Sequence, residues 1–244
     1  MNAGRERLDR LLSRLGYCSR QEVRQWLRQG RIAVADLRNP APAAHVQPDA
    51  VRLDGETLDH PQGLTLIYHK PVGLVCSHRE NGRLIYEAFP ARWLGRKPQL
   101  SAVGRLDKDT SGLLILTDDG GLNHHLTSPR RKIYKTYRAT LARPLQGHEQ
   151  ALFAAGTLML DGETAPCLPA ELHVLDEHKA ELTLHEGRYH QVRRMFAAAG
   201  NHVDALCRIR IGELALADTG LQAGEYRDID PEPLLAWIEP GKHS

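Results

Sequence analysis

The stretch from Ser101 to Asp119, SAVGRLDKDTSGLLILTDD, constrains the fold and the function of this chain more than any other. A short apolar segment leads into a charged cluster at residues 104–109. A predicted turn at residues 110–112 and a strand-like segment at residues 113–116 follow. A charged loop between two apolar strands is a place where a carboxylate can lie at the floor of a cleft. The alternative is a solvated surface turn whose Arg and Asp side chains pair with each other.

Length, composition, net charge and cysteine spacing limit the kinds of protein that this chain can be. With 244 residues and 41% hydrophobic residues, the chain can build one large or two modest domains. The net charge of +2 does not by itself indicate a nucleic-acid partner. The four cysteines form no C-x-x-C pair, which argues against a zinc ribbon or a redox motif. Because no signal segment and no apolar run of about 18 residues is present, we expect a soluble, cytoplasmic protein without a membrane anchor.

The first 30 residues predict two helices. Leucines at positions 8, 11, 12 and 15 share one helical face, and this helix ends near Gly16. Ser19 and Glu22 form the predicted capping box of the second helix. Arginines dominate the solvent side, and since guanidinium groups match phosphates, a surface of one sign predicts contact with nucleic acid rather than ordinary solvation. The residues predicted to bind RNA here are Arg7, Arg20, Arg24, Arg28 and Arg31.

The pattern RLDRLL…G…SR…V…L..GRI.V…DG, from Arg5 to Leu58, resembles the small S4-type RNA-binding module of ribosomal proteins. This chain departs from the pattern at residues 33–48, where a Pro-Ala-rich segment replaces the usual compact hairpin. A breaker-rich HPQG segment follows. We therefore predict an RNA-binding module over residues 1–60 and a second, catalytic domain over residues 64–244.

The segment GRLDKDTSGLLILT resembles the signature loop of the pseudouridine synthases, and most closely the RsuA family that modifies ribosomal RNA. KPVG with VCS, KTY, and EGRYHQVRRMF continue the resemblance downstream. The resemblance implies that Asp107 is the catalytic carboxylate, that Tyr137 packs against the target base, and that Arg188 is the cationic partner of Asp107.

Three further residues are predicted to contact RNA. Arg105, two residues before Asp107, is a candidate to fill the gap left by a flipped-out nucleotide. His190 and Arg193 lie on the predicted helix after Gly187, on the side away from its apolar residues. Two interpretations of Lys70 remain open, contact with RNA or a position at the surface.

The resemblance implies an α+β fold: a small helical and sheet RNA-binding module followed by a catalytic domain with a mixed, mainly antiparallel central sheet flanked by helices. It also implies the isomerisation of uridine to pseudouridine, which needs no redox step and no phosphate donor. The chain has no G-x-G-x-x-G or Walker loop, and the adjacent His124 and His125 point to different sides of a helix. We therefore expect neither a cofactor nor a metal.

The expected partner is ribosomal RNA, free or within an assembling particle, and the expected state is a monomer. TSPR before KTY, together with GNHV, favours 16S rRNA as the target, with 23S rRNA as the alternative. A non-catalytic RNA-binding factor in ribosome assembly is a hypothesis of another class. A metal-dependent deaminase or nuclease would require clustered ligands, which the sequence does not indicate.

Overall fold

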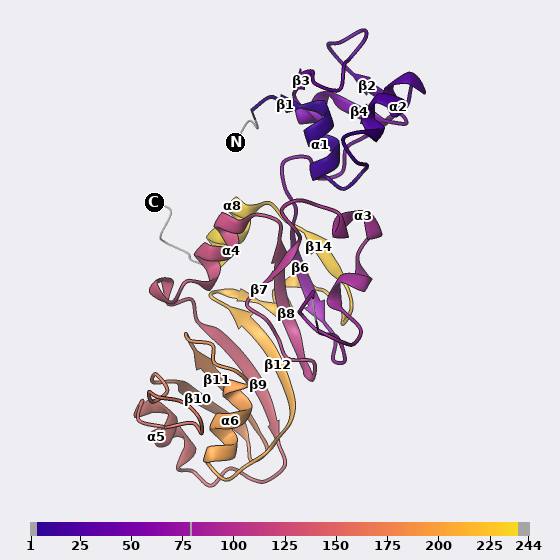
Figure 1. Ribbon diagram of the computed structural model, residues 1–244. Helices are drawn as coiled ribbons and strands as arrows, with labels where there is room; N and C mark the ends of the chain where they lie inside the picture. Colours follow the sequence, from indigo (N-terminus) through magenta and orange to yellow (C-terminus); the bar gives the residue numbers. More distant parts are fainter. Residues whose placement is uncertain (1–3, 79, 239–244) are drawn as a thin grey trace. The chain divides into compact units, whose positions relative to one another are not determined.

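The structure is a computed structural model that describes residues 4–78 and 80–238 (Figure 1). The first three residues of the predicted RNA-binding module and the last six of the predicted catalytic domain lie outside the described residues. The described chain forms two compact units. Residues up to 65 group with 86–101 and 117–120 in the first unit, and 66–85, 102–116 and the residues from 121 onward form the second.

The first unit is built from short elements. They are β1 (Glu6–Arg7), α1 (Leu8–Arg14), α2 (Glu22–Arg28), β2 (Ile32–Val34), β3 (His45–Val46), β4 (Val51–Leu53), β5 (Glu56–Thr57) and α3 (Ala91–Leu94), with a 3₁₀ turn at Pro48–Ala50. β1 pairs with β3, while β2, β4 and β5 form an antiparallel sheet. The four leucines predicted to share a face of α1 are completely buried. The helix ends before Gly16, where a Cβ would lie 2.4 Å from the carbonyl oxygen of Arg92.

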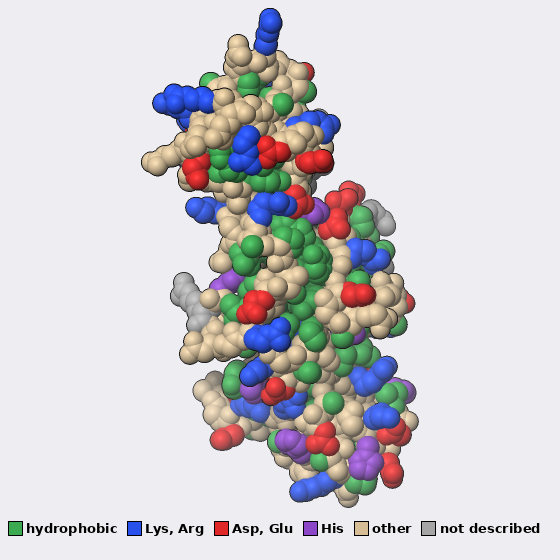
Figure 2. All heavy atoms as spheres, turned by 90° about the vertical axis from the view of Figure 1, so that its right-hand side faces the viewer, with side chains coloured by type: hydrophobic (Ala, Val, Ile, Leu, Met, Phe, Trp, Pro, Cys, Tyr) green, Lys and Arg blue, Asp and Glu red, His purple; other side chains and the backbone are tan. Residues whose placement is uncertain are grey.

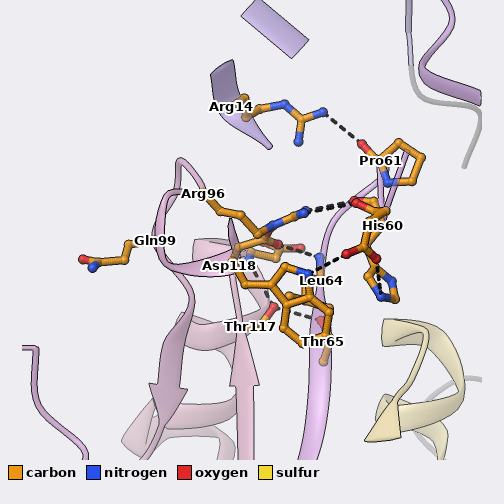
Figure 3. Close-up of polar contacts among 12 residues, drawn as sticks. Arg14, His60, Pro61, Leu64, Thr65, Arg96, Gln99, Thr117 and Asp118 are labelled. Atoms are coloured by element: carbon orange, nitrogen blue, oxygen red, sulfur yellow. Dashed lines mark hydrogen bonds and ion pairs between the residues drawn. The ribbon is translucent and has the colours of Figure 1, made fainter. Parts of the chain in front are cut away.

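A buried arginine fixes the segment that follows the small sheets (Figure 3). Arg96 donates a hydrogen bond to Asp118 Oδ2 at 2.7 Å and another to the carbonyl oxygen of His60 at 2.8 Å. Asp118 Oδ1 in turn accepts the backbone N–H of Leu64 at 2.8 Å. A buried ion pair is tolerated when further hydrogen bonds satisfy both groups, as here. The breaker-rich HPQG segment is therefore anchored at both of its ends within this unit.

The second unit contains most of a large mixed sheet. Its elements, including those that continue from the first unit, are β6 (Thr65–Lys70), β7 (Ser101–Val103), β8 (Thr110–Thr117), α4 (Gly120–Thr127), β9 (Lys135–Leu141), α5 (Glu149–Ala154), β10 (Glu171–Asp176), β11 (Lys179–Leu184), α6 (Gln191–Ala198), β12 (Val203–Ile211), β13 (Leu214–Ala215), α7 (Leu216–Thr219), β14 (Tyr226–Asp228) and α8 (Pro231–Ile238), with 3₁₀ turns at Ile85–Ala88 and Pro129–Arg131. Among the described residues the strand order is β10-β11-β9-β12-β8-β6-β14, with β13 on β12 and β7 on β8.

This sheet confirms the predicted fold class. β12 and β8 run parallel, whereas β10–β11, β11–β9, β9–β12 and β14–β6 are antiparallel pairs. Figure 1 shows α5 and α6 beside strands β9, β10 and β11. Phe153 of α5 and Phe196 of α6 meet edge to face at 5.3 Å in the hydrophobic core over these strands. A second core joins α4 and α8 to β6 and β8.

The predicted turn at residues 110–112 is wrong, because these residues begin strand β8. Gly112 has a φ of 112°, and a Cβ at this position would lie 2.3 Å from the carbonyl oxygen of Arg208. The glycine is therefore needed for the close approach of β12, not for a change of chain direction.

Candidate active site

The loop that carries Asp107 joins β7 to β8, as the sequence predicts, and a buried lysine holds its backbone. The Lys70 ammonium donates hydrogen bonds to the carbonyl oxygens of Pro71, Asp107 and Thr110 at 3.1, 3.0 and 2.8 Å. Burial lowers the pKa of Lys70. The side chain is fully buried, so neither interpretation left open for it, RNA contact or a surface position, is correct. Its position at the end of β6 carries no sequence signal for this role.

Arg208 supports the loop from β12. Its side chain is buried, and it donates to the carbonyl oxygen of Leu113 at 2.8 Å and to that of Gly104 at 3.2 Å. A Cβ at Gly104 would lie 3.8 Å from Arg208 Nη1 and 4.0 Å from Lys135 Cε. Two cationic side chains therefore lie beside the start of the Asp107 loop. Neither of them was predicted from the sequence to be a site residue.

Lys135 is a partly buried cation with a lowered pKa. Its burial, and secondarily the charge of Arg208, lower its pKa to about 8. The ammonium donates to the carbonyl oxygen of Ile133 at 3.2 Å. Lys135 is thus a partly buried cation beside the start of the Asp107 loop.

Tyr137 lies on β9, directly opposite Arg208 of β12 in the antiparallel register. Directly opposed residues of an antiparallel pair project from the same face of the sheet. The phenol ring packs against the edge of the core under α5 and α6 and is partly exposed. The strand predicted for residues 135–141 is confirmed as β9.

The Asp107 carboxylate faces a histidine, not the predicted arginine. His190 Nε2 lies 3.4 Å from Asp107 Oδ1, and the two groups form an ion pair when the imidazole is protonated. About a third of each side chain is exposed, 33% for Asp107 and 39% for His190. Arg193 also reaches this loop, because it donates to the carbonyl oxygen of Asp109 at 3.0 Å. The two residues predicted to bind RNA at the start of this helix thus lie at the Asp107 loop.

The predicted pairing of Arg188 with Asp107 is wrong. The Arg188 guanidinium donates to Glu186 at 3.2 Å and to the carbonyl oxygens of Ala165 and Pro166. Glu163 lies 3.6 Å from Arg188 and also accepts a hydrogen bond from Arg194 at 2.9 Å. The chain adopts a left-handed conformation at His190, whose φ is 49°, and the Arg188 side chain extends toward residues 163–166. Arg188 therefore ties this segment to the start of α6.

The predicted RNA-binding arginines of the first unit fall into two groups. Arg7 pairs with Asp9 at 2.7 Å, and Arg31 pairs with Asp54 at 2.6 Å while its guanidinium lies over the ring of Trp26. The other three are exposed and have no ion pair among the described residues; they are Arg20, Arg24 and Arg28. Arg105, in the second unit, is exposed and pairs with Glu80.

A basic cavity in the first unit was not predicted. It has a volume of about 390 Å³, and it is lined by Arg10, Ser13, Arg14, Arg20 and Lys97. Arg14 is engaged by Glu6 at 2.7 Å. Arg10, Arg20 and Lys97 are exposed and lack an ion pair within the described part of the chain. Unpaired cations that converge on a hollow are suited to an anion such as a phosphate group.

The described residues show no sign of a metal site or of a membrane-spanning helix. Within residues 4–78 and 80–238, no group of three or more His, Cys, Asp or Glu side chains is arranged to hold a metal ion. No helix among these residues has the length and apolar character that a bilayer crossing requires. On the face drawn in Figure 2, Lys and Arg side chains are interspersed with Asp and Glu side chains and do not form one continuous basic surface.

Two family models match the chain. The RNA pseudouridylate synthase family matches residues 64–198, and the S4 domain matches residues 6–36. The chain is 42% identical to the ribosomal small subunit pseudouridine synthase A of Pasteurella multocida, over 95% of this chain and 99% of that protein. The protein of the same name from Escherichia coli is 39% identical, over 95% of this chain and all of that protein. A solved structure described as a pseudouridylate synthase has a TM-score of 0.66 at 34% identity and covers 96% of this chain and 100% of its own.

Proposed function

Because this chain belongs to the RNA pseudouridylate synthase family and carries an S4 domain, we propose that it isomerises a specific uridine of small-subunit (16S) ribosomal RNA to pseudouridine. The names of its relatives support the choice of subunit. We place the reaction in the cytoplasm, where ribosomal RNA is assembled into subunits.

The observation that carries this proposal is the environment of Asp107. Its carboxylate is partly exposed on the loop between β7 and β8, whose backbone is held by buried Lys70, and His190 lies 3.4 Å away. Arg208 and Lys135 add positive charge beside the same loop. Such neighbours keep a carboxylate ionised when RNA closes over it and removes water. An ionised carboxylate is the group this reaction requires, either as a nucleophile or as a base.

The reaction is an isomerisation, so atoms balance without any co-reactant. The bond between N1 of uracil and C1′ of the ribose breaks, and a bond between C5 and C1′ forms. The proton on C5 is lost, and N1 acquires a proton. In this proposal Asp107 acts on the target nucleoside, and Tyr137 stacks against the detached uracil while it turns. Arg193, not Arg188, provides a cation at this loop, and His190 adds a second one when its imidazole is protonated.

Loss of the C5 proton gives a direct test. Small-subunit rRNA transcripts labelled with tritium at C5 of uridine are expected to release label with the wild-type protein. Asp107→Asn keeps the size of the side chain and removes its charge, so we expect a loss of activity of at least 1000-fold with RNA binding retained. Equal release by the wild type and the variant would refute the assignment of Asp107.

The same assay separates the alternatives. Label released from 23S but not from 16S transcripts would move the target to the large subunit. Binding of rRNA without release of label from free rRNA or from assembling particles would favour a non-catalytic role in ribosome assembly. Comparing free rRNA with assembling particles identifies the form of the substrate.

A further inference from the structure

We propose that Tyr189, stacked on His190, forms an exposed platform that binds by stacking a nucleobase adjacent to the target uridine. The inference rests on the proposed function, since it adds a binding site for the flanking nucleotide to the same catalytic centre. Its ligand class is an unpaired base of single-stranded RNA.

The platform is a pair of parallel rings with one open face. The ring centroids of Tyr189 and His190 are 3.9 Å apart, and the ring planes differ by 16°. Tyr189 is 76% exposed, more than any other large hydrophobic side chain in the described part of the chain. With one face covered by His190, the ring keeps its opposite face for a ligand. Base–aromatic stacking uses such a free face and tolerates any base.

The backbone beneath the rings is held firmly. His190 adopts a left-handed conformation with φ 49°, which is uncommon for a residue other than glycine. Arg194 Nη1 donates to the carbonyl oxygen of Tyr189 at 3.0 Å, and the Arg188 N–H donates to Gln191 Oε1 at 2.9 Å. Since these bonds fix the turn before a ligand arrives, the exposed ring is presented in a defined orientation.

The platform adjoins the reacting group. His190, the inner ring of the stack, lies 3.4 Å from the Asp107 carboxylate. A target nucleotide must leave its stack to reach that carboxylate, so its neighbour in the RNA loses a stacking partner. An aromatic face beside the carboxylate replaces that partner. The positive charge of Arg193 attracts the phosphate groups of the RNA backbone to this region.

Substitutions at Tyr189 test the proposal, because an exposed side chain can be changed without disturbing the core. We expect Tyr189→Phe and Tyr189→Trp to bind 16S rRNA transcripts and to release label much as the wild type does. Tyr189→Leu and Tyr189→Ala are expected to raise the Kd and to lower kcat/KM, each by about 5- to 100-fold, because one stacked base is lost.

Tyr134→Leu is the control for these variants. Tyr134 is another exposed tyrosine beside a histidine, but its ring meets His185 at 61°, and we expect no change.

A fluorescence measurement tests the stacking at Tyr189 without relying on enzymatic activity. The Trp of Tyr189→Trp should lose fluorescence when rRNA is added, beyond the change seen for the wild type with its own tryptophans. A Leu variant that matches Phe would overturn the proposal, since it would show that apolar area and not stacking matters. A Phe variant as weak as Ala would also overturn it. If the wild type releases no label, the proposed function fails, while the fluorescence change and the order of Kd values still decide on the platform.

Discussion

A lysine that does not reach solvent helps to hold the backbone around Asp107. The Lys70 ammonium donates hydrogen bonds to the backbone carbonyls of Pro71, Asp107, Lys108 and Thr110. Methionine has nearly the same length but no donor, so Lys70→Met removes the ammonium's hydrogen bonds to these carbonyls, of which that of Asp107 keeps, among the described residues, only the N–H of Thr110. We expect the free energy of unfolding to fall by about 2–4 kcal/mol and kcat to fall at least 10-fold, with little change in KM. Urea unfolding and the tritium assay measure the two effects.

Lys179→Met is the matched control for this variant. Lys179 is exposed and pairs with Asp176 at 3.6 Å, so we expect its loss to change stability by less than about 1 kcal/mol. A Lys70→Met protein with normal kcat would show that the lysine does not position the Asp107 loop for the reaction.

The lowered pKa of Lys135 predicts how the stability of the protein changes with pH. Its pKa is about 8 in the folded protein against an ordinary value of 10.5. The unfolded chain therefore binds more protons between these values, and this group contributes a destabilisation below pH 8 that is relieved as the pH rises toward 10.5. Lys135→Met should raise the free energy of unfolding at pH 7 by about 1–3 kcal/mol, and the gain should shrink between pH 8 and 10. Urea unfolding across this range is the measurement. A gain that stays constant with pH would contradict the assignment.

At the scale of elements, the sequence predicts the helices, strands and loops that depend on a local pattern of residues. The apolar alternation of β9 and the helical spacing of Val192, Met195 and Phe196 both correspond to observed elements with those residues in the core. The charged loop between β7 and β8 is also observed. Each of these features depends on about ten consecutive residues, so the local sequence is enough to predict it.

Features that depend on distant partners were not predictable. Gly112 follows Thr and Ser, which indicates a turn locally, yet its real constraint is the backbone of Arg208, almost 100 residues away. The direction of Arg188 depends on the left-handed turn at His190 and on acceptors in residues 163–166, none of which carries a signal in the sequence. The same holds for Lys70, whose acceptors lie on another segment.

The contact between β8 and β12 can be tested at Gly112. Alanine would place a Cβ 2.3 Å from a backbone oxygen at a φ of 112°. Because backbone cannot move aside as a flexible side chain does, we expect Gly112→Ala to lower the free energy of unfolding by about 2–4 kcal/mol. It should also lower kcat, since Arg208 reaches the Asp107 loop from the displaced strand. Gly120→Ala, with open space around the added methyl group, should be neutral or slightly stabilising in thermal unfolding. Equal effects of the two changes would refute this account.

At the scale of the whole molecule, RNA binding depends on which cations are free, since the net charge is only +2. Arg24 is exposed and unpaired among the described residues, whereas Arg31 is held by Asp54 and Trp26. A free arginine that meets a phosphate releases counterions on binding, while a paired one already has its counterion. Lys97 lines the basic cavity and is also unpaired within the described chain.

These differences predict a ranking of salt dependence for 16S rRNA binding. Arg24→Ala and Lys97→Ala should each reduce the slope of log K against log salt by about 0.7–0.9, the value for one phosphate contact. Arg31→Ala should change the slope by less than half of that, because its guanidinium is engaged within the protein. None of the three changes should move the modified uridine, since phosphate contacts fix the register of the RNA without reading its bases. Filter binding between about 50 and 200 mM salt, with mapping of the product, tests all three. Equal slopes for Arg24→Ala and Arg31→Ala would mean that the intramolecular pairs open when RNA binds, and that the surface charge acts as a whole.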